Sequence, residues 1–136
     1  MQLHTYLNYG GNCEQAFRFY EQHLGGKIIM MMKHGESPEP SQAPPDWKDA
    51  VLHARIQLGG TQLLGADIPN SQPIRSAYLS LTVNSDQEAE RVHDLLADGG
   101  QVFMPMQETF FASRFAMLRD RFGTSWMILN PRPQAA

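Results

Sequence analysis

The second half of this chain repeats the pattern of the first half, and this repeat constrains the fold more than any other feature. Gly60-Thr61-Gln62-Leu63-Leu64 returns, with substitutions, as Gly123-Thr124-Ser125-Trp126-Met127. A helical pattern spans residues 12–24 and a second one spans 85–98, and each stops at a pair of glycines. The repeat predicts two strand–helix–strand–strand–strand units whose curved sheets enclose a cleft, where function is to be sought.

Alternating apolar and polar residues place the strands of the two units. In the first module, residues 1–67, strands are expected at 3–9, 27–32, 51–58 and 61–65. In the second module, residues 76–131, strands are expected at 77–83, 101–104, 110–119 and 124–130. We therefore predict an α+β fold in which two tandem βαβββ modules make one domain over residues 1–136.

Capping and breaking residues refine this prediction. Asn12 with Gln15, and Ser85 with Glu88, have the spacing of capping boxes at the two helix starts. Residues 34–49 contain four prolines, a density that neither a helix nor a central strand tolerates. We predict an exposed loop there, with a lid over the cleft as the alternative.

Composition excludes several classes of function. The 136 residues carry 11 basic and 14 acidic side chains, a net charge of −3, so we expect no nucleic-acid partner, which would need a clustered basic face. No apolar run reaches the length of a membrane-spanning helix, and no signal peptide is visible. Cys13 is the single cysteine, so no disulfide can form within the chain. We expect a cytoplasmic protein.

Several segments, taken in order, resemble one known family. They are Tyr6-Leu7-Asn8, Gly11-Asn12-Cys13-Glu14-Gln15-Ala16-Phe17, Phe19-Tyr20, His53-Ala54, Gly59-Gly60, Gly99-Gly100, Met104-Pro105-Met106-Gln107 and Phe122-Gly123-Thr124-Ser125-Trp126-Met127. The chain resembles the vicinal oxygen chelate superfamily, with the glyoxalase/bleomycin-resistance/dioxygenase fold. More narrowly, it resembles the PhnB-like branch, described as 3-demethylubiquinone methyltransferase-like. The resemblance implies paired βαβββ modules and a homodimer. No glycine-rich loop of the kind that binds a methyl donor follows a strand.

The resemblance also implies where a metal would bind. Metal-dependent members of the superfamily take one ligand from the first and one from the last strand of each module, and these positions fall on His4, Leu64, Tyr78 and Met127. Leu and Met offer no hard oxygen donor to a divalent ion. We therefore predict no cofactor, and keep as the alternative a divalent metal held by His4 and His53.

Strand alternation assigns the remaining candidates to the cleft. His53 is either a general base or donor, or a hydrogen-bonded sheet residue; Arg55 suits an anionic group, or else pairs with a nearby carboxylate. His4 is a further catalytic candidate, or else a partly buried strand histidine bonded to a neighbour. Glu108 is a minor acid/base candidate. The predicted ligand-binding set is Tyr6, His53, Arg55, Tyr78, Phe111 and Met127.

The sequence leaves three functions open. The first is a protein that binds a small organic molecule in its cleft without the usual metal. The second is a metal-dependent lyase, isomerase or dioxygenase that acts on a small vicinal-oxygen substrate. The third is a structural or regulatory dimer without a ligand.

Overall fold

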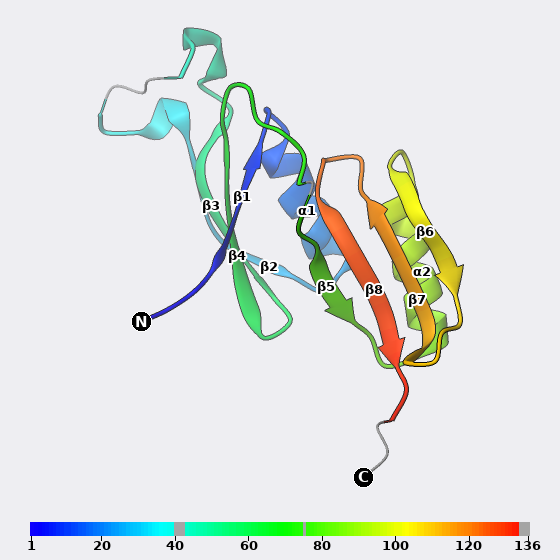
Figure 1. Ribbon diagram of the computed structural model, residues 1–136. Coiled ribbons are helices and arrows are strands. Elements are labelled where there is room, and N and C mark those ends of the chain that lie inside the picture. The colour runs from blue at the N-terminus through cyan, green and yellow to red at the C-terminus, as the bar shows by residue number, and fades with distance from the viewer. Residues whose placement is uncertain (40–42, 75, 134–136) are drawn as a thin grey trace. The chain divides into compact units, whose positions relative to one another are not determined.

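Each half of the chain forms a four-stranded sheet with one helix packed against it (Figure 1). The computed structural model describes residues 1–39, 43–74 and 76–133. The chain divides into two compact units, Met1–Gln72 and Pro73–Ala136. Each unit has the order strand, helix, and three strands, so the predicted α+β fold with tandem βαβββ modules is confirmed. The cleft that the modules are expected to share stays a prediction.

The first module contains β1 (Thr5–Tyr9), α1 (Cys13–His23), β2 (Lys27–Lys33), β3 (Val51–Leu58) and β4 (Thr61–Asp67). Its strands lie in the order β1-β4-β3-β2. β1 runs parallel to β4, and the other neighbours are antiparallel. The predicted hairpin at Gly59-Gly60 joins β3 to β4, with Gly59 at a φ of 60°, a backbone conformation that glycine adopts without strain.

The second module contains β5 (Leu79–Thr82), α2 (Asp86–Ala97), β6 (Gln101–Gln107), β7 (Ala112–Arg119) and β8 (Ser125–Pro131). Its strand order, β5-β8-β7-β6, repeats that of the first module. β5 is parallel to β8, as β1 is to β4. The internal repeat in the sequence therefore corresponds to a repeat in topology.

One face of each sheet packs against its helix. In the first module this face and α1 bury Leu7, Tyr9, Phe17, Tyr20 and Ile56. In the second, α2 covers a core that includes Val92, Leu96, Leu118, Trp126 and Ile128. Side chains alternate along a strand, so the intervening residues lie on the opposite face, which we call the open face of each module.

Several predicted boundaries were wrong. β5 starts at Leu79 and β7 at Ala112, which leaves Tyr78 and Phe111 just ahead of their strands. β6 continues through Pro105 to Gln107, because β6 lies at the edge of its sheet and a proline there costs no ladder hydrogen bond on the outer side.

The proline-rich segment 34–49, predicted as a loop, has regular backbone in two places. It contains two 3₁₀ turns, His34–Glu36 and Pro45–Trp47. Pro45 stands at the first position of its turn, where no N–H is needed. Residues 40–42 of the predicted loop lie outside the described residues.

The two helices start where predicted, but only one is capped by its own N-cap side chain. Ser85 Oγ accepts a hydrogen bond from Glu88 N at 3.1 Å. The Asn12 side chain makes no capping hydrogen bond. Instead, the carboxylate of Asp67 accepts hydrogen bonds from the main-chain N–H groups of Gly11 and Cys13.

Candidate functional site

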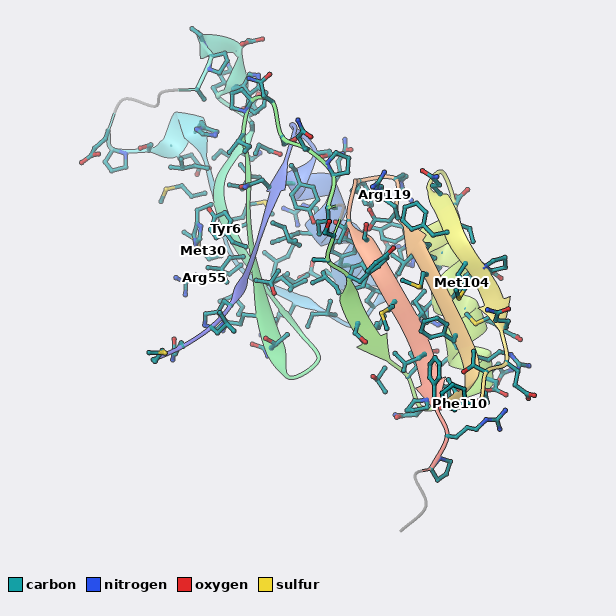
Figure 2. The ribbon with its side chains drawn as sticks, in the orientation of Figure 1. Tyr6, Met30, Arg55, Met104, Phe110 and Arg119 are labelled. Atoms are coloured by element: carbon teal, nitrogen blue, oxygen red, sulfur yellow. The ribbon has the colours of Figure 1, made fainter. Side chains whose placement is uncertain are left out.

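A row of four side chains crosses the open face of the first module. The strand register pairs Tyr6 with Leu64, Leu64 with Arg55, and Arg55 with Met30. Figure 2 shows Tyr6, Met30 and Arg55 on the same side of this sheet, away from α1. Because directly paired residues point to the same face, the row places a phenol and a guanidinium on either side of an apolar leucine.

His53 joins the two polar ends of this row. Its Nδ1 lies 3.2 Å from the Tyr6 hydroxyl, and its Nε2 accepts a hydrogen bond from Arg55 Nε at 3.4 Å. The Tyr6 and His53 rings also lie close, with centroids 5.8 Å apart. Three of the predicted ligand-binding residues, from two strands separated by β4, are therefore in contact on one surface.

The surroundings of this group shift its proton equilibria. Burial, and then the positive charge of Arg55, lower the pKa of His53. Burial, and then the neighbouring Cys13, raise the pKa of Tyr6. The histidine is thus held neutral and the tyrosine is held protonated near neutral pH. In the part of the chain that the structure describes, Arg55 forms no ion pair, so the predicted alternative of a carboxylate partner is wrong there.

His4 does not belong to this group. It lies one residue ahead of β1 and is exposed, so its interpretation as a partly buried strand histidine is wrong. The register places Thr5 beside Leu63, which itself lies beside Ile56, three residues along β3 from His53. Neighbouring strand residues rise by about 3.3 Å, so His4 and His53 are well separated along the sheet.

The positions that the superfamily resemblance assigns to metal ligands do not suit a divalent ion. Leu64 and Met127 lie within β4 and β8 as predicted, but their side chains offer no oxygen or imidazole donor. Among residues 1–39, 43–74 and 76–133, no three His, Cys, Asp or Glu side chains gather in a way that could hold an ion. The donor set at these positions does not fit the superfamily's metal.

The open face of the second module has a different chemistry. The row that corresponds to Tyr6–Leu64–Arg55–Met30 is Ser80–Met127–Met117–Met104. Met127 is half-buried, whereas its neighbour Trp126 is buried on the helix side, as the alternation predicted. Its three methionines make most of this row apolar and adaptable, since methionine side chains are flexible and polarisable.

Tyr78 and Phe111 lie at the two ends of this second face. Tyr78 meets the ring of Phe103 edge-on, with centroids 6.4 Å apart, and Arg119 lies over the same ring. Phe111 is 40% exposed and packs edge-on against Phe115 at 5.1 Å. Both residues therefore lie at the surface of the second module.

Glu108 lies beside a separate cavity of about 490 Å³ between α2 and β6. Glu90, His93, Met106 and Arg114 also line this cavity. Glu108 forms an ion pair with Arg132, with Oε2 and Nη2 3.1 Å apart. The two residues are 24 positions apart in the sequence, and no pattern there predicts the pair. Glu108 is thus in an ion pair on the helix side of the second module.

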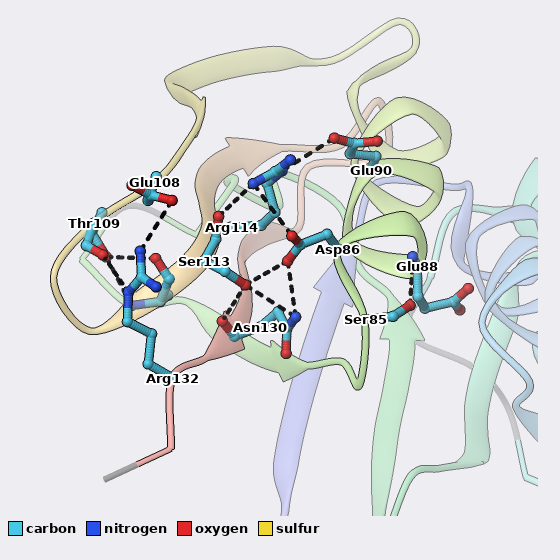
Figure 3. A network of polar contacts seen from close by, with 11 residues as sticks. Ser85, Asp86, Glu88, Glu90, Glu108, Thr109, Ser113, Arg114, Asn130 and Arg132 are labelled. Carbon is cyan, nitrogen blue, oxygen red and sulfur yellow. Dashed lines mark hydrogen bonds and ion pairs between the residues drawn. The ribbon is translucent and has the colours of Figure 1, made fainter. Parts of the chain in front are cut away.

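A polar network next to this cavity was not predicted (Figure 3). Asp86 accepts hydrogen bonds from Ser113 Oγ at 2.5 Å and from Asn130 Nδ2 at 2.9 Å. Arg114 lies between two carboxylates: its Nη1 is 3.4 Å from Asp86 Oδ2, and its Nε is 3.1 Å from Glu90 Oε1. The hydrogen bonds from Ser113 and Asn130 lower the pKa of Asp86. The network ties the start of α2 to β7 and β8, so its evident role is structural.

Comparison with known proteins agrees with this fold. The sequence profile of the 3-demethylubiquinone-9 3-methyltransferase family matches residues 1–129. The chain belongs to this family. It is 32% identical to protein YjdN of Escherichia coli K12, with 94% of each chain covered. Among solved structures, protein PA1353 of Pseudomonas aeruginosa is 42% identical over 98% of this chain and 99% of its own, with a TM-score of 0.86.

More distant structures identify the fold class. A PhnB protein from Bacillus cereus, which bears the same methyltransferase description, is 24% identical with a TM-score of 0.82, covering 96% of this chain and 99% of its own. A glyoxylase/bleomycin resistance protein/dioxygenase domain from Frankia is 17% identical with a TM-score of 0.65, covering 97% and 98%. The predicted glyoxalase/bleomycin-resistance/dioxygenase fold and the PhnB-like branch are therefore confirmed.

Proposed function

We propose that this protein binds a small organic molecule on the open face of its first module, and that it does so without a metal ion. The observation that carries the proposal is the contact of Tyr6, His53 and Arg55 on one partly exposed surface. Polar groups that converge beside apolar side chains are the usual composition of a small-molecule site. Leu64 and Met30 supply the apolar part.

The open face of the second module is a further candidate surface within the same proposal. Met127, Tyr78 and Phe111 offer it apolar and aromatic contact area. These side chains suit hydrophobic ligand parts, because aromatic rings and thioethers gain most from removal of apolar surface from water.

A thermal-shift screen tests the proposal. Purified protein, treated with a chelator, is heated with each member of a metabolite panel. A ligand of the native state raises the melting temperature by mass action, and we expect at least one compound to do so with the chelator present. Arg55→Gln should reduce this rise, whereas Arg18→Gln should keep it, because Arg18 lies on α1 and pairs with Glu14.

Metal analysis of protein purified without a chelator, together with this screen, separates the proposal from the rival functions. Stoichiometric nickel, manganese, iron or zinc that is lost in His4→Ala or His53→Ala would favour the metal-dependent enzyme. A panel in which no compound shifts the melting temperature would favour a dimer without a ligand.

We further propose that the protein is a cytoplasmic homodimer. Phe110 is 92% exposed and lies against Phe111, which leaves apolar surface for a second copy. Cys13 is buried and unbonded, as suits a reducing compartment. No helix among the described residues is long and apolar enough to span a membrane. Light scattering after gel filtration measures the oligomeric state, and twice the monomer mass of 15.3 kDa is expected.

A further inference from the structure

The direction of the hydrogen bonds at His53 follows from the chemistry of its partners. Arg55 Nε can only donate, so the Nε2 atom of His53 accepts and carries no proton. A neutral imidazole with an unprotonated Nε2 carries its proton on Nδ1. That N–H then donates to the hydroxyl oxygen of Tyr6, 3.2 Å away.

This arrangement leaves the Tyr6 hydroxyl proton directed elsewhere. The oxygen accepts from His53, and no acceptor for the Tyr6 proton is present among the described residues. The guanidinium of Arg55 likewise donates only its Nε–H to His53, so its remaining N–H groups are available to a ligand. The exposed surface of the group therefore presents donors from both ends.

An apolar strip separates and flanks these donors. Leu64 lies between Tyr6 and Arg55 in the register, and Met30 lies on the far side of Arg55. A ligand that satisfies the donors and also covers this strip needs acceptor atoms at one end and an apolar body. Charge-assisted hydrogen bonds to an ionised oxygen are about twice as strong as neutral ones, so an anionic head uses the donors best.

We propose that the ligand of this face is an organic oxyanion, whose carboxylate or phosphate head binds Tyr6 and Arg55 while its apolar body covers Leu64 and Met30. His53 is a positioning residue, which turns the Tyr6 hydroxyl toward the ligand. This inference rests on the proposed function and narrows it to one class of ligand.

The open face of the second module lacks the guanidinium and the imidazole that stand at the corresponding positions of the first module. Met117 stands at the position that corresponds to Arg55, and Ser80 at the position of Tyr6. Phe115, two residues before Met117, stands in the place of His53. The guanidinium and imidazole are thus absent from this second row, and the oxyanion is expected on the row of the first module.

Three probes of similar shape test the ligand class: benzoate, phenyl phosphate and the neutral benzamide. Backbone amide NMR of the whole protein measures the dissociation constant and the residues that respond. We expect benzoate or phenyl phosphate to shift resonances of β1 and β3, and benzamide to bind about tenfold more weakly or worse. Arg55→Gln and Tyr6→Phe should each weaken the acid about tenfold, whereas Arg18→Gln should leave it unchanged.

The role of His53 has its own readout, the nitrogen spectrum of its imidazole. In the wild-type protein at neutral pH we expect an unprotonated Nε2 and a protonated Nδ1, and in Arg55→Gln a mixture of the two tautomers. A wild-type ring protonated on Nε2 would overturn the positioning role, whatever the affinity.

The outcomes separate this inference from the function on which it rests. Benzamide that binds β1 and β3 as tightly as benzoate overturns the oxyanion class but supports an organic ligand on this face. If neither acid shifts these strands, the oxyanion inference is also wrong, and the metabolite panel alone decides whether an organic ligand binds.

Discussion

The carboxylate of Asp67 holds the first turn of the helix that begins at Cys13, although the two residues are 54 positions apart in the chain. Oδ1 accepts hydrogen bonds from Gly11 N at 2.9 Å and Cys13 N at 3.0 Å, and Oδ2 accepts one from Val51 N at 2.8 Å. One buried side chain at the end of β4 thus fixes the start of α1 and the start of β3.

Removing this carboxylate should destabilise the protein strongly. Asp67→Ala leaves three main-chain N–H groups without their acceptor. Those of Cys13 and Val51 are buried, and each buried unsatisfied group costs about 1–3 kcal/mol. We expect the free energy of unfolding to fall by at least about 2 kcal/mol in urea denaturation. Asp67→Asn, which keeps one acceptor oxygen, should cost less.

The N-cap positions of the two helices provide the matched controls. Ser85→Ala removes a capping hydrogen bond and should cost about 1 kcal/mol. Asn12→Ala removes a side chain that makes no such bond and should cost less than about 0.5 kcal/mol. A larger loss for Asn12→Ala than for Ser85→Ala would show that the Asn12 side chain itself caps α1.

Gly100 should not tolerate a side chain, because the backbone leaves no room for a Cβ atom at this position. A Cβ atom at Gly100 would collide with the carbonyl oxygen of Arg119 and lie 3.1 Å from backbone atoms of Asp120. Gly100→Ala should therefore destabilise the protein by about 1–3 kcal/mol. Gly60→Ala, where no atom lies within 4 Å of the added carbon, should change stability by less than about 0.5 kcal/mol. Equal costs for the two variants in thermal denaturation would contradict this packing.

The titration of His53 should reveal its neighbours. Its pKa should lie below the ordinary value of 6.5, and Arg55→Gln should raise it part of the way back, because burial, the larger cause, remains. The unfolded chain binds this proton more readily, so the contribution of His53 to stability is complete above pH 6.5 and declines as the pH falls through the folded pKa. Imidazole proton NMR measures the midpoint. A midpoint at or above the ordinary value would rule out the neutral, Arg55-bonded ring.

Asp86 gives a second titration test in the other module. Its pKa is lowered first by the Ser113 hydroxyl, so Ser113→Ala should raise it toward, but not to, its ordinary value of 3.8, since Asn130 remains. A lowered carboxyl pKa stabilises the fold above the unfolded value, and this stabilisation is lost as the pH falls. Carboxyl carbon NMR follows the change, with Glu14 of the first module as an unaffected reference. An unchanged Asp86 titration would show that Ser113 is not its main partner.

Local patterns predicted most of the fold. Alternation along the strands placed Tyr6, His53 and Arg55 on one face, because side chains of a strand alternate between its two faces. The contacts among these three residues could not be predicted from the sequence, because they depend on β4 lying between β1 and β3 in one particular register. The glycine pair at residues 59–60 predicted its hairpin because the backbone conformation is local.

The errors arose where a distant residue decides. Asn12 is a residue type that often caps helices, but here the Asp67 side chain accepts the hydrogen bond from the first helical N–H group. His4 was placed in a strand that begins one residue later. β6 passes through Pro105 because it is an edge strand, a fact of sheet order rather than of composition.

The most direct test of metal-free oxyanion binding is a crystal structure of chelator-treated protein soaked with benzoate. We expect a carboxylate within hydrogen-bond distance of the Tyr6 hydroxyl and the Arg55 guanidinium, with the ring over Leu64. A cation coordinated by His4 or His53, or benzoate bound only away from this face, would contradict this expectation.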